Sequence, residues 1–220
     1  MDPAARSDPV AQGSPAEGPG PAIPAKYAAV VEAAAEVFLE QGFGNASMDE
    51  IARRAGVSKA TVYNYFDSKP ALFGAIVQQR CQRSLPAMLG EFSDRSIDEA
   101  LTLVGRQFLD VLMMPGSLPL YRTVLAEAPR FPEVGRVFYE AGPGRVAAGL
   151  ATYFQMHEAR GQLNVADPRL AAEQFLAAVL GHIHVRLLLG LSDAPPGPEE
   201  RARAVAEAVS TFLDGRRRRP

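Results

Sequence analysis

The sequence predicts an all-α protein. Apolar residues recur at three- and four-residue steps through most of the chain, and no alternating pattern is long enough for a strand. The breaks between these periodic segments are rich in Gly and Pro, as expected for turns between helices. A pair of short capped segments near the N-terminus further predicts a helix-turn-helix. We therefore expect a small three-helix N-terminal domain followed by a larger C-terminal helical domain.

Composition excludes several classes of protein. The 220 residues, 47% of them hydrophobic, suffice for one large domain or two small ones, and the net charge of −2 excludes a chain coated in basic charge. The single cysteine, Cys81, rules out an intramolecular disulfide and fits a reducing compartment. No signal peptide is recognisable, and the apolar stretch Phe175–Leu191 is too short and too polar for a membrane span. We expect a cytoplasmic protein with no membrane partner.

Residues 1–24 are rich in Pro and Gly and almost free of large apolar side chains, so we expect a disordered tail. The first helix is predicted from Ala25 to Gln41, where Gly42 is a natural C-terminal stop. The expected division is residues 1–24 as the tail, 25–70 as the helix-turn-helix domain, 71–214 as the C-terminal domain and 215–220 as a basic tail.

The C-terminal domain reads as one helix after another. Pro143, between two glycines, should kink or interrupt the helix that contains it. The expected helices begin after Ser68, reaching Leu85 or a turn or two beyond, and then span Ile97–Met113, Ser117–Glu127, Pro132–Arg160, Pro168–Leu191 and Glu199–Leu213.

The helix-turn-helix is predicted from its caps and its packing positions. Ser47 and Glu50 form a capping box, which starts a helix that Gly56 ends within three turns. Ser58 then caps a second helix that runs from Lys59 to Phe66. The inward positions of both helices are apolar or small, which allows the close crossing that this motif requires.

The outward face of the second helix carries side chains suited to DNA. In this motif the second helix enters the major groove. Lys59 can donate to guanine or phosphate, Thr61 can contact a thymine methyl or a phosphate, and Asn64 can read adenine or contact the backbone. The hydroxyls of Tyr63 and Tyr65 can reach phosphate oxygens.

Plainer interpretations of the same residues stay open. Tyr63, Tyr65 and above all Phe66 are also what the core around a helix pair would contain. Arg53 and Arg54 add positive charge to the first helix of the motif, but such residues more often form a solvated face. DNA binding is therefore predicted from all of these residues together and not from any one of them.

These residues resemble a known family. The segment that carries the resemblance reads Ser47…Ile51-Ala52…Ala55-Gly56-Val57-Ser58-Lys59-Ala60-Thr61-Val62-Tyr63-Asn64-Tyr65-Phe66-Asp67-Ser68-Lys69…Leu72. It is similar to the N-terminal signature of TetR family transcriptional regulators, and the close resemblance covers about residues 27–77. The later part of the chain, with its Arg-Phe-Pro-Glu segment, Gly161 and Asp167-Pro168, looks like the C-terminal domain of the AcrR/AefR-like branch.

The resemblance implies a homodimer that binds a palindromic double-stranded DNA operator, usually as a repressor, and that is released by a small-molecule inducer. It implies phosphate contacts from Thr61, Tyr63, Tyr65 and Lys69, and base-facing positions at Lys59, Ala60 and Asn64. The full set of expected DNA-binding residues is Ser47, Ser58, Lys59, Ala60, Thr61, Tyr63, Asn64, Tyr65 and Lys69.

The resemblance also makes residues 71–214 a ligand-sensing and dimerisation domain. The last two predicted helices are expected to form the contact between subunits, since one is apolar nearly all round and the other is amphipathic with small residues. Aromatic and Met content suits an apolar or aromatic ligand, although most of the candidates, taken one by one, are more typical of a core. The candidate pocket residues are Phe108, Leu112, Met113, Tyr121, Phe138, Tyr153 and His182.

Other functions are disfavoured by the motifs that the sequence lacks. It shows no Gly-rich phosphate loop, no nucleophile elbow and no Cys/His/Asp constellation with usable spacing, so we expect no enzymatic activity and no cofactor. His182 and His184 are two residues apart and would point to different sides of a helix, so no metal site is expected. The remaining alternative is a ligand-binding scaffold protein without DNA binding, which the complete Lys59–Phe66 helix argues against.

Overall fold

The computed structural model describes residues 24–84, 95–191 and 195–217. Nearly all of the expected N-terminal tail, 1–24, and the end of the expected basic tail, 218–220, lie outside the described residues. The described part is all-α, as predicted, and its only β-type pairing is one isolated bridge between Leu163 and Arg217. None of its helices is long and apolar enough to cross a membrane.

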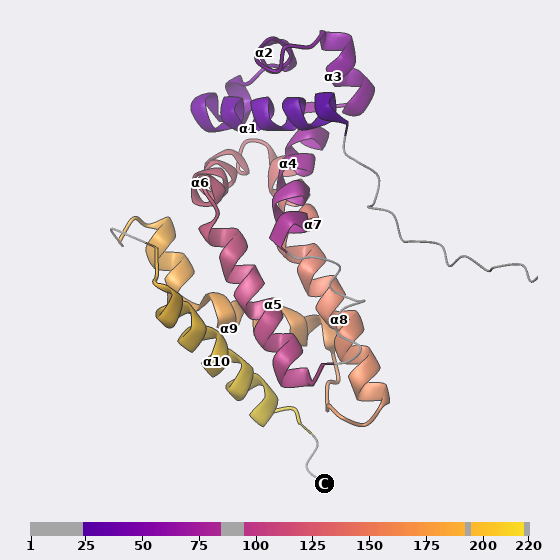
Figure 1. The fold of residues 1–220 in the computed structure, drawn as a ribbon, viewed down its shortest axis with the longest axis vertical. Helices are drawn as coiled ribbons and strands as arrows, with labels where there is room; N and C mark the ends of the chain where they lie inside the picture. Colours follow the sequence, from indigo (N-terminus) through magenta and orange to yellow (C-terminus); the bar gives the residue numbers. More distant parts are fainter. Residues whose placement is uncertain (1–23, 85–94, 192–194, 218–220) are drawn as a thin grey trace, which may run out of the picture.

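The N-terminal head consists of α1 (Ala25–Asn45), α2 (Met48–Arg54) and α3 (Lys59–Tyr65). Figure 1 shows the head at one end of the molecule, with α1 lying across the top of the remaining helices. Val30, Phe38 and Ile51 are fully buried between these helices. The apolar periodicity of α1 therefore buries one face of it in the head, as the sequence predicts.

The linking helix α4 leads from the head into the body, which holds the remaining helices (Figure 1). The predicted bounds of α5 and α6 agree with the structure, because a Ser caps α5 and a Pro-Gly turn separates the two helices. The observed bounds are α4 Lys69–Ser84, α5 Ile97–Met113, α6 Ser117–Glu127, α7 Pro132–Ala141, α8 Pro143–Ala159, α9 Pro168–Leu188 and α10 Pro198–Asp214.

Several predicted helices differ from the structure. The first, expected to end at Gln41, extends to Asn45 with Gly42 non-helical inside it. The expected single helix Pro132–Arg160 is two helices, because Gly142 is non-helical (φ −111°, ψ −109°) and Pro143 begins α8 without an N–H to continue the ladder. The helix expected to reach Leu191 ends at Leu188, and Gly181 (φ 45°, ψ −144°) interrupts it. Only glycine adopts such a conformation readily, which explains the kink.

Two hydrophobic clusters hold the described residues together, and they do not divide the chain at residue 70. One is built from α5, α8, α9 and α10, with Phe154 and Phe175 at its centre. The other joins the head and the first half of α4 to Leu120 and Val124 of α6 and Val134 of α7. The head is therefore packed directly on two helices of the body. Movement of α6 or α7 would displace side chains that pack against the head.

Replacing Gly42 by alanine is expected to lower the free energy of unfolding by about 2 kcal/mol. Gly42 adopts φ 75° and ψ 165°, which only glycine tolerates well, and a Cβ there would lie 2.8 Å from Oε1 of Glu127. Urea denaturation followed by far-UV circular dichroism measures the change. Gly215→Ala is the matched control, because Gly215 has an ordinary φ of −81° and its Cβ would have only normal contacts. An equal effect of both substitutions would contradict this prediction.

Candidate nucleic-acid interface and ligand cavity

Two serine caps fix the geometry of the α2–turn–α3 unit. The Ser47 hydroxyl accepts from the backbone N–H of Glu50 at 3.2 Å, and the Ser58 hydroxyl accepts from that of Thr61 at 3.1 Å. The Thr61 hydroxyl lies 2.8 Å from that of Ser58. Gly56 takes the left-handed turn position at φ 66°. Ser47, Ser58 and Thr61 thus support the local fold as well as standing at the surface where DNA contacts are expected.

One side of α3 is anchored in the core and the other is exposed. Val62 is fully buried, and Phe66, directly after the helix, is 5% exposed. Ala60, Tyr63 and Asn64 are exposed on the opposite side, so the structure leaves these expected DNA-binding positions accessible. A short helix held by one buried stripe and by the Ser58 cap presents its outer side chains in a defined orientation.

Tyr65 is less free than its neighbours. Its ring packs edge-on against that of Tyr27 at 5.7 Å and lies 6.3 Å from that of Phe66, yet 38% of the residue is exposed. The aromatic body therefore packs on α1 while part of the side chain remains at the surface. Tyr65 combines the core and the surface interpretations that the sequence left open.

Lys59, at the start of α3, forms an ion pair with Asp49 of α2. Lys59 Nζ lies 2.8 Å from Oδ1 of Asp49, and both side chains are more than half exposed. The Asp49 carboxylate raises the pKa of Lys59 through a hydrogen bond and through its charge. A phosphate or guanine that approaches Lys59 must compete with this carboxylate or share the ammonium with it.

Lys69, which is expected to contact phosphate, makes its hydrogen bonds inside the protein. Its ammonium donates to the backbone carbonyls of Phe43, Gly44 and Ala46 at 2.6, 3.1 and 2.8 Å, and lies 4.6 Å from the centre of the Phe43 ring. An ammonium has three N–H donors, and these three contacts use them all. Burial lowers the pKa of Lys69. Lys69 therefore ties the start of α4 to the carbonyls at and just after the end of α1.

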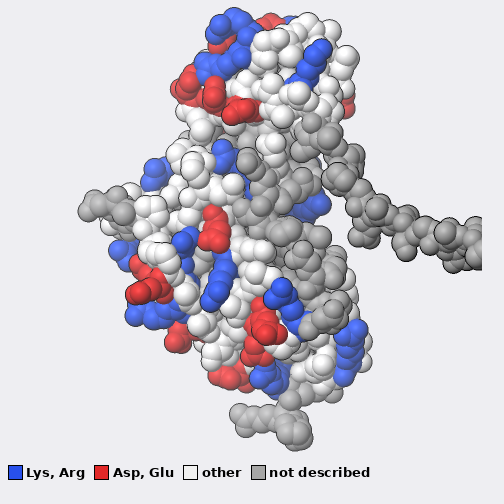
Figure 2. All heavy atoms as spheres, viewed as in Figure 1, with Lys and Arg blue, Asp and Glu red and all other residues white. Residues whose placement is uncertain are grey.

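The head as a whole is not basic. Residues 25–70 hold five basic and six acidic side chains. Nη1 of Arg54 lies 2.8 Å from Oε1 of Glu40, and Nη2 of Arg53 lies 2.7 Å from Oε1 of Glu50. Both arginines expected to add positive charge are therefore paired. In Figure 2 charged side chains of both signs gather toward the α2 side of the head, and its right-hand side, where Figure 1 places α3, is mostly uncharged. Non-specific attraction to DNA should accordingly be weak.

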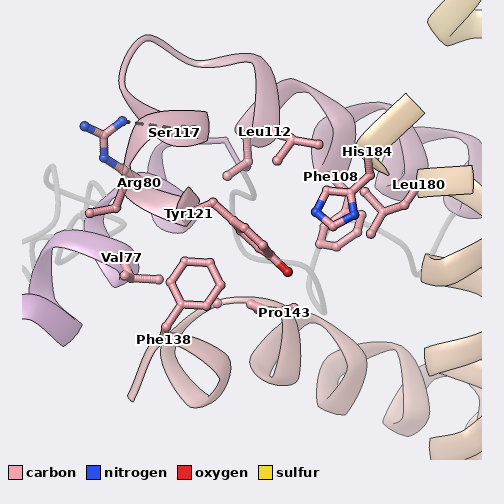
Figure 3. A pocket seen from close by; sticks show the side chains of 13 residues that line it. Val77, Arg80, Phe108, Leu112, Ser117, Tyr121, Phe138, Pro143, Leu180 and His184 are labelled. Carbon is pink, nitrogen blue, oxygen red and sulfur yellow. Dashed lines mark hydrogen bonds between the residues drawn. The ribbon is translucent and has the colours of Figure 1, made fainter. Parts of the chain in front are cut away.

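A largely apolar cavity of about 110 Å³ lies between α4, α5, α6, α7 and α9. This is several times the space that a single water molecule needs. Figure 3 shows aromatic and aliphatic side chains surrounding it. The cavity is lined by Val77, Arg80, Phe108, Val111, Leu112, Ser117, Leu120, Tyr121, Phe138, Gly142, Pro143, Leu180 and His184.

Four of the residues expected at a ligand pocket line this cavity, namely Phe108, Leu112, Tyr121 and Phe138. Three others lie elsewhere. Met113 is next to Leu112 on α5 but does not line the cavity. Tyr153 is buried in the cluster of α5, α8, α9 and α10, and His182 is exposed in a groove between α9 and α10.

The histidine that lines the cavity is His184. Leu180 and His184 both line the cavity, and they lie on either side of the kink at Gly181, which breaks the regular helical spacing between them. The two-residue step from His182 to His184 shows in the sequence that the two side chains point to different sides of a helix, but not which of them faces the cavity. The α4 residues Val77 and Arg80 had no comparable signal, because the sequence does not show how α4 lies against α6.

The N-terminal part of the chain, residues 30–76, matches the family model described as bacterial regulatory proteins, tetR family. Residues 99–215, more than half of the chain, match the model of the AefR-like transcriptional repressor C-terminal domain. This chain belongs to the TetR family. The family consists of transcriptional regulators and not of enzymes, which confirms both the resemblance and the expectation that the chain is not an enzyme.

Individual relatives agree with this TetR assignment. The regulator UidR of Escherichia coli K12 is 33% identical over 110 residues, which are 48% of this chain and 53% of UidR. The activator FasR of Mycolicibacterium smegmatis is 53% identical over 47 residues, 21% of this chain and 22% of FasR. The chain thus spans about half the length of UidR, and less of FasR.

Solved structures match over almost their whole length. The Flavonoid-responsive Regulator FrrA is 38% identical with a TM-score of 0.72, covering 89% of this chain and 98% of FrrA. A TetR-family regulator from Mesorhizobium loti is 30% identical with a TM-score of 0.73, covering 88% of this chain and 97% of the other. The TetR fold therefore extends over both the head and the body.

Proposed function

We propose that the protein is a homodimeric regulator that binds a palindromic DNA operator through α3 and is released from it by a small aromatic ligand. The observation that carries the proposal is the rigid outer face of α3. Ala60, Tyr63 and Asn64 are exposed there, Ser58 caps the helix, and the buried Val62 fixes its rotation. In this motif such a face enters the major groove.

The proposed dimer contact is the face of α9 and α10. A groove between these helices contains small residues, among them Ala178, Ala204 and Ala208, which would let a second copy approach closely. Near the C-terminal end of α9 the apolar residue Val185 is 48% exposed, and Leu189, directly after the helix, is 67% exposed. A two-fold contact there would place two α3 helices on one side of the dimer.

Replacing Ala178 by arginine is expected to raise the dissociation constant of the dimer by more than about a hundredfold, because an unpaired charge would be buried in the contact. Sedimentation equilibrium measures it. Ala148→Arg is the matched control, since Ala148 is an exposed alanine on α8. A dimer that survives A178R but not A148R would place the contact elsewhere.

Ligand control is proposed to act through α4. Val77 and Arg80 of α4 line the cavity, and Arg80 donates to the backbone carbonyl of Pro115, before α6, at 2.7 Å. A ligand that spreads these walls would move α4, and Lys69 ties the start of α4 to α1. The related structure FrrA is named as flavonoid-responsive, which supports an aromatic ligand here.

Selection of genomic DNA fragments by the purified full chain tests the operator part of the proposal. The expected result is one enriched motif with two-fold symmetry and half-sites about one helical turn apart. Enrichment of an asymmetric motif would contradict the dimeric reading of DNA. Enrichment of none, with protein that has been unfolded and refolded to remove any bound ligand, would favour a scaffold protein without DNA binding.

A further inference from the structure

Two polar side chains that line the largely apolar cavity, Tyr121 and His184, have no hydrogen-bond partner among the described residues. The Tyr121 hydroxyl and the ring nitrogens of His184 make no hydrogen bond to any part of the chain that the structure describes. Their rings meet edge-on at 5.0 Å. Figure 3 shows the Tyr121 ring extending into the cavity with its hydroxyl at the tip, and His184 on the wall beside Phe108. Both groups open on the cavity, so a molecule bound there could form hydrogen bonds with them.

We propose that Tyr121 and His184 bind a neutral aromatic ligand through one hydroxyl group on its ring. This inference rests on the proposed function, because it names the chemistry of the ligand that the cavity senses. A neutral imidazole offers one acceptor nitrogen, and a phenol O–H is a strong neutral donor to it. The Tyr121 hydroxyl can donate to the ligand oxygen in return. Phe108 and Phe138 supply the apolar surface for the ring.

The burial of both groups favours a neutral ligand over a charged one. Burial lowers the pKa of His184 and raises the pKa of Tyr121, so both side chains are uncharged at neutral pH. A carboxylate bound between them would lose its hydration without gaining an opposite charge from either group. The one charged group on the cavity wall, Arg80, is held by the carbonyl of Pro115.

Isothermal titration with three probes of one shape tests the proposal: 2-naphthol, naphthalene and 2-naphthoate. The full chain is expected to bind 2-naphthol about tenfold more tightly than naphthalene and to bind 2-naphthoate more weakly than 2-naphthol. Tyr121→Phe and His184→Phe keep the aromatic rings and should each weaken 2-naphthol binding about five- to tenfold while leaving naphthalene binding unchanged. Leu112→Met, which alters only an apolar wall, should change the affinities for 2-naphthol and naphthalene by the same factor.

Several outcomes would overturn this inference. Equal affinity for 2-naphthol and naphthalene would remove the hydroxyl preference, and tighter binding of 2-naphthoate would replace it by an anion preference. Absence of binding by all three probes would show that the cavity takes no such ligand. The proposed function fails separately: DNA selection that enriches no motif would refute it whatever the titrations show, and an enriched operator would leave it standing without the hydroxyl preference.

Discussion

Replacing Lys69 by methionine is expected to lower the free energy of unfolding by about 3 kcal/mol. The substitution keeps the length of the apolar stem but removes the ammonium from the carbonyls of Phe43, Gly44 and Ala46. Hydrogen bonds to a charged group stabilise a fold by about 1.5–3 kcal/mol each, and water can satisfy part of what is lost because the site is only partly buried. Urea denaturation followed by far-UV circular dichroism measures the change.

Lys59→Met is the matched control for this experiment. Lys59 is exposed, and its ion pair with Asp49 is at the surface, so its loss should change the free energy of unfolding by less than about 0.5 kcal/mol. DNA binding separates the two lysines further. Lys59→Met should make the slope of log affinity for DNA against log salt concentration shallower by about one, which corresponds to one counterion fewer released. If K69M folds with unchanged stability but shows that reduced salt dependence, Lys69 contacts phosphate and the structural role assigned to it is wrong.

Replacing Asn64 by alanine is expected to weaken binding to the selected operator by about ten- to hundredfold and to leave binding to unrelated DNA unchanged. Asn64 is exposed on the outer face of α3, and an amide that reads a base edge contributes about 1–3 kcal/mol of discrimination. Tyr63→Phe, on the same face, removes only a hydroxyl. Tyr63→Phe should weaken binding to the operator and to unrelated DNA by the same factor as each other. It should not change the salt dependence of binding, because a neutral hydroxyl releases no counterion.

Fluorescence anisotropy with labelled operator and unrelated duplexes measures both effects. Ser210→Ala is a suitable control, since Ser210 is exposed on α10, far along the chain from the head. If Asn64→Ala weakened binding to both duplexes equally, Asn64 would contact the backbone and not a base. If neither substitution changed any affinity, the outer face of α3 would not be the DNA-binding surface.

Local signals in the sequence were sufficient for the head. The Ser47 and Ser58 caps and the turn at Gly56 are short-range features, and the structure has each of them at the expected residue. The same holds for α5 and α6, whose ends are defined by a cap and a Pro-Gly turn. Such features depend on neighbours in the chain, so they can be recognised without knowing the tertiary fold.

The features that sequence did not predict depend on how helices lie against each other. The carbonyls that accept from Lys69 are more than twenty residues away in the chain, so the sequence does not show that its ammonium makes these contacts. Arg80 lines the cavity only because α4 lies beside the turn before α6. His184 and not His182 lines the cavity because the kink at Gly181, which the sequence does not reveal, determines which side of α9 faces inward.

The proposed function depends most on recognition of a particular base sequence by α3. The measurement that tests it most directly is the affinity of the full chain for its selected duplex relative to a scrambled duplex of the same length and composition, at physiological salt. The head has one more acidic than basic side chain, so non-specific binding should be weak and the ratio of affinities at least about a thousandfold. A ratio near one would contradict the account, because contacts to the phosphate backbone alone would then explain all binding.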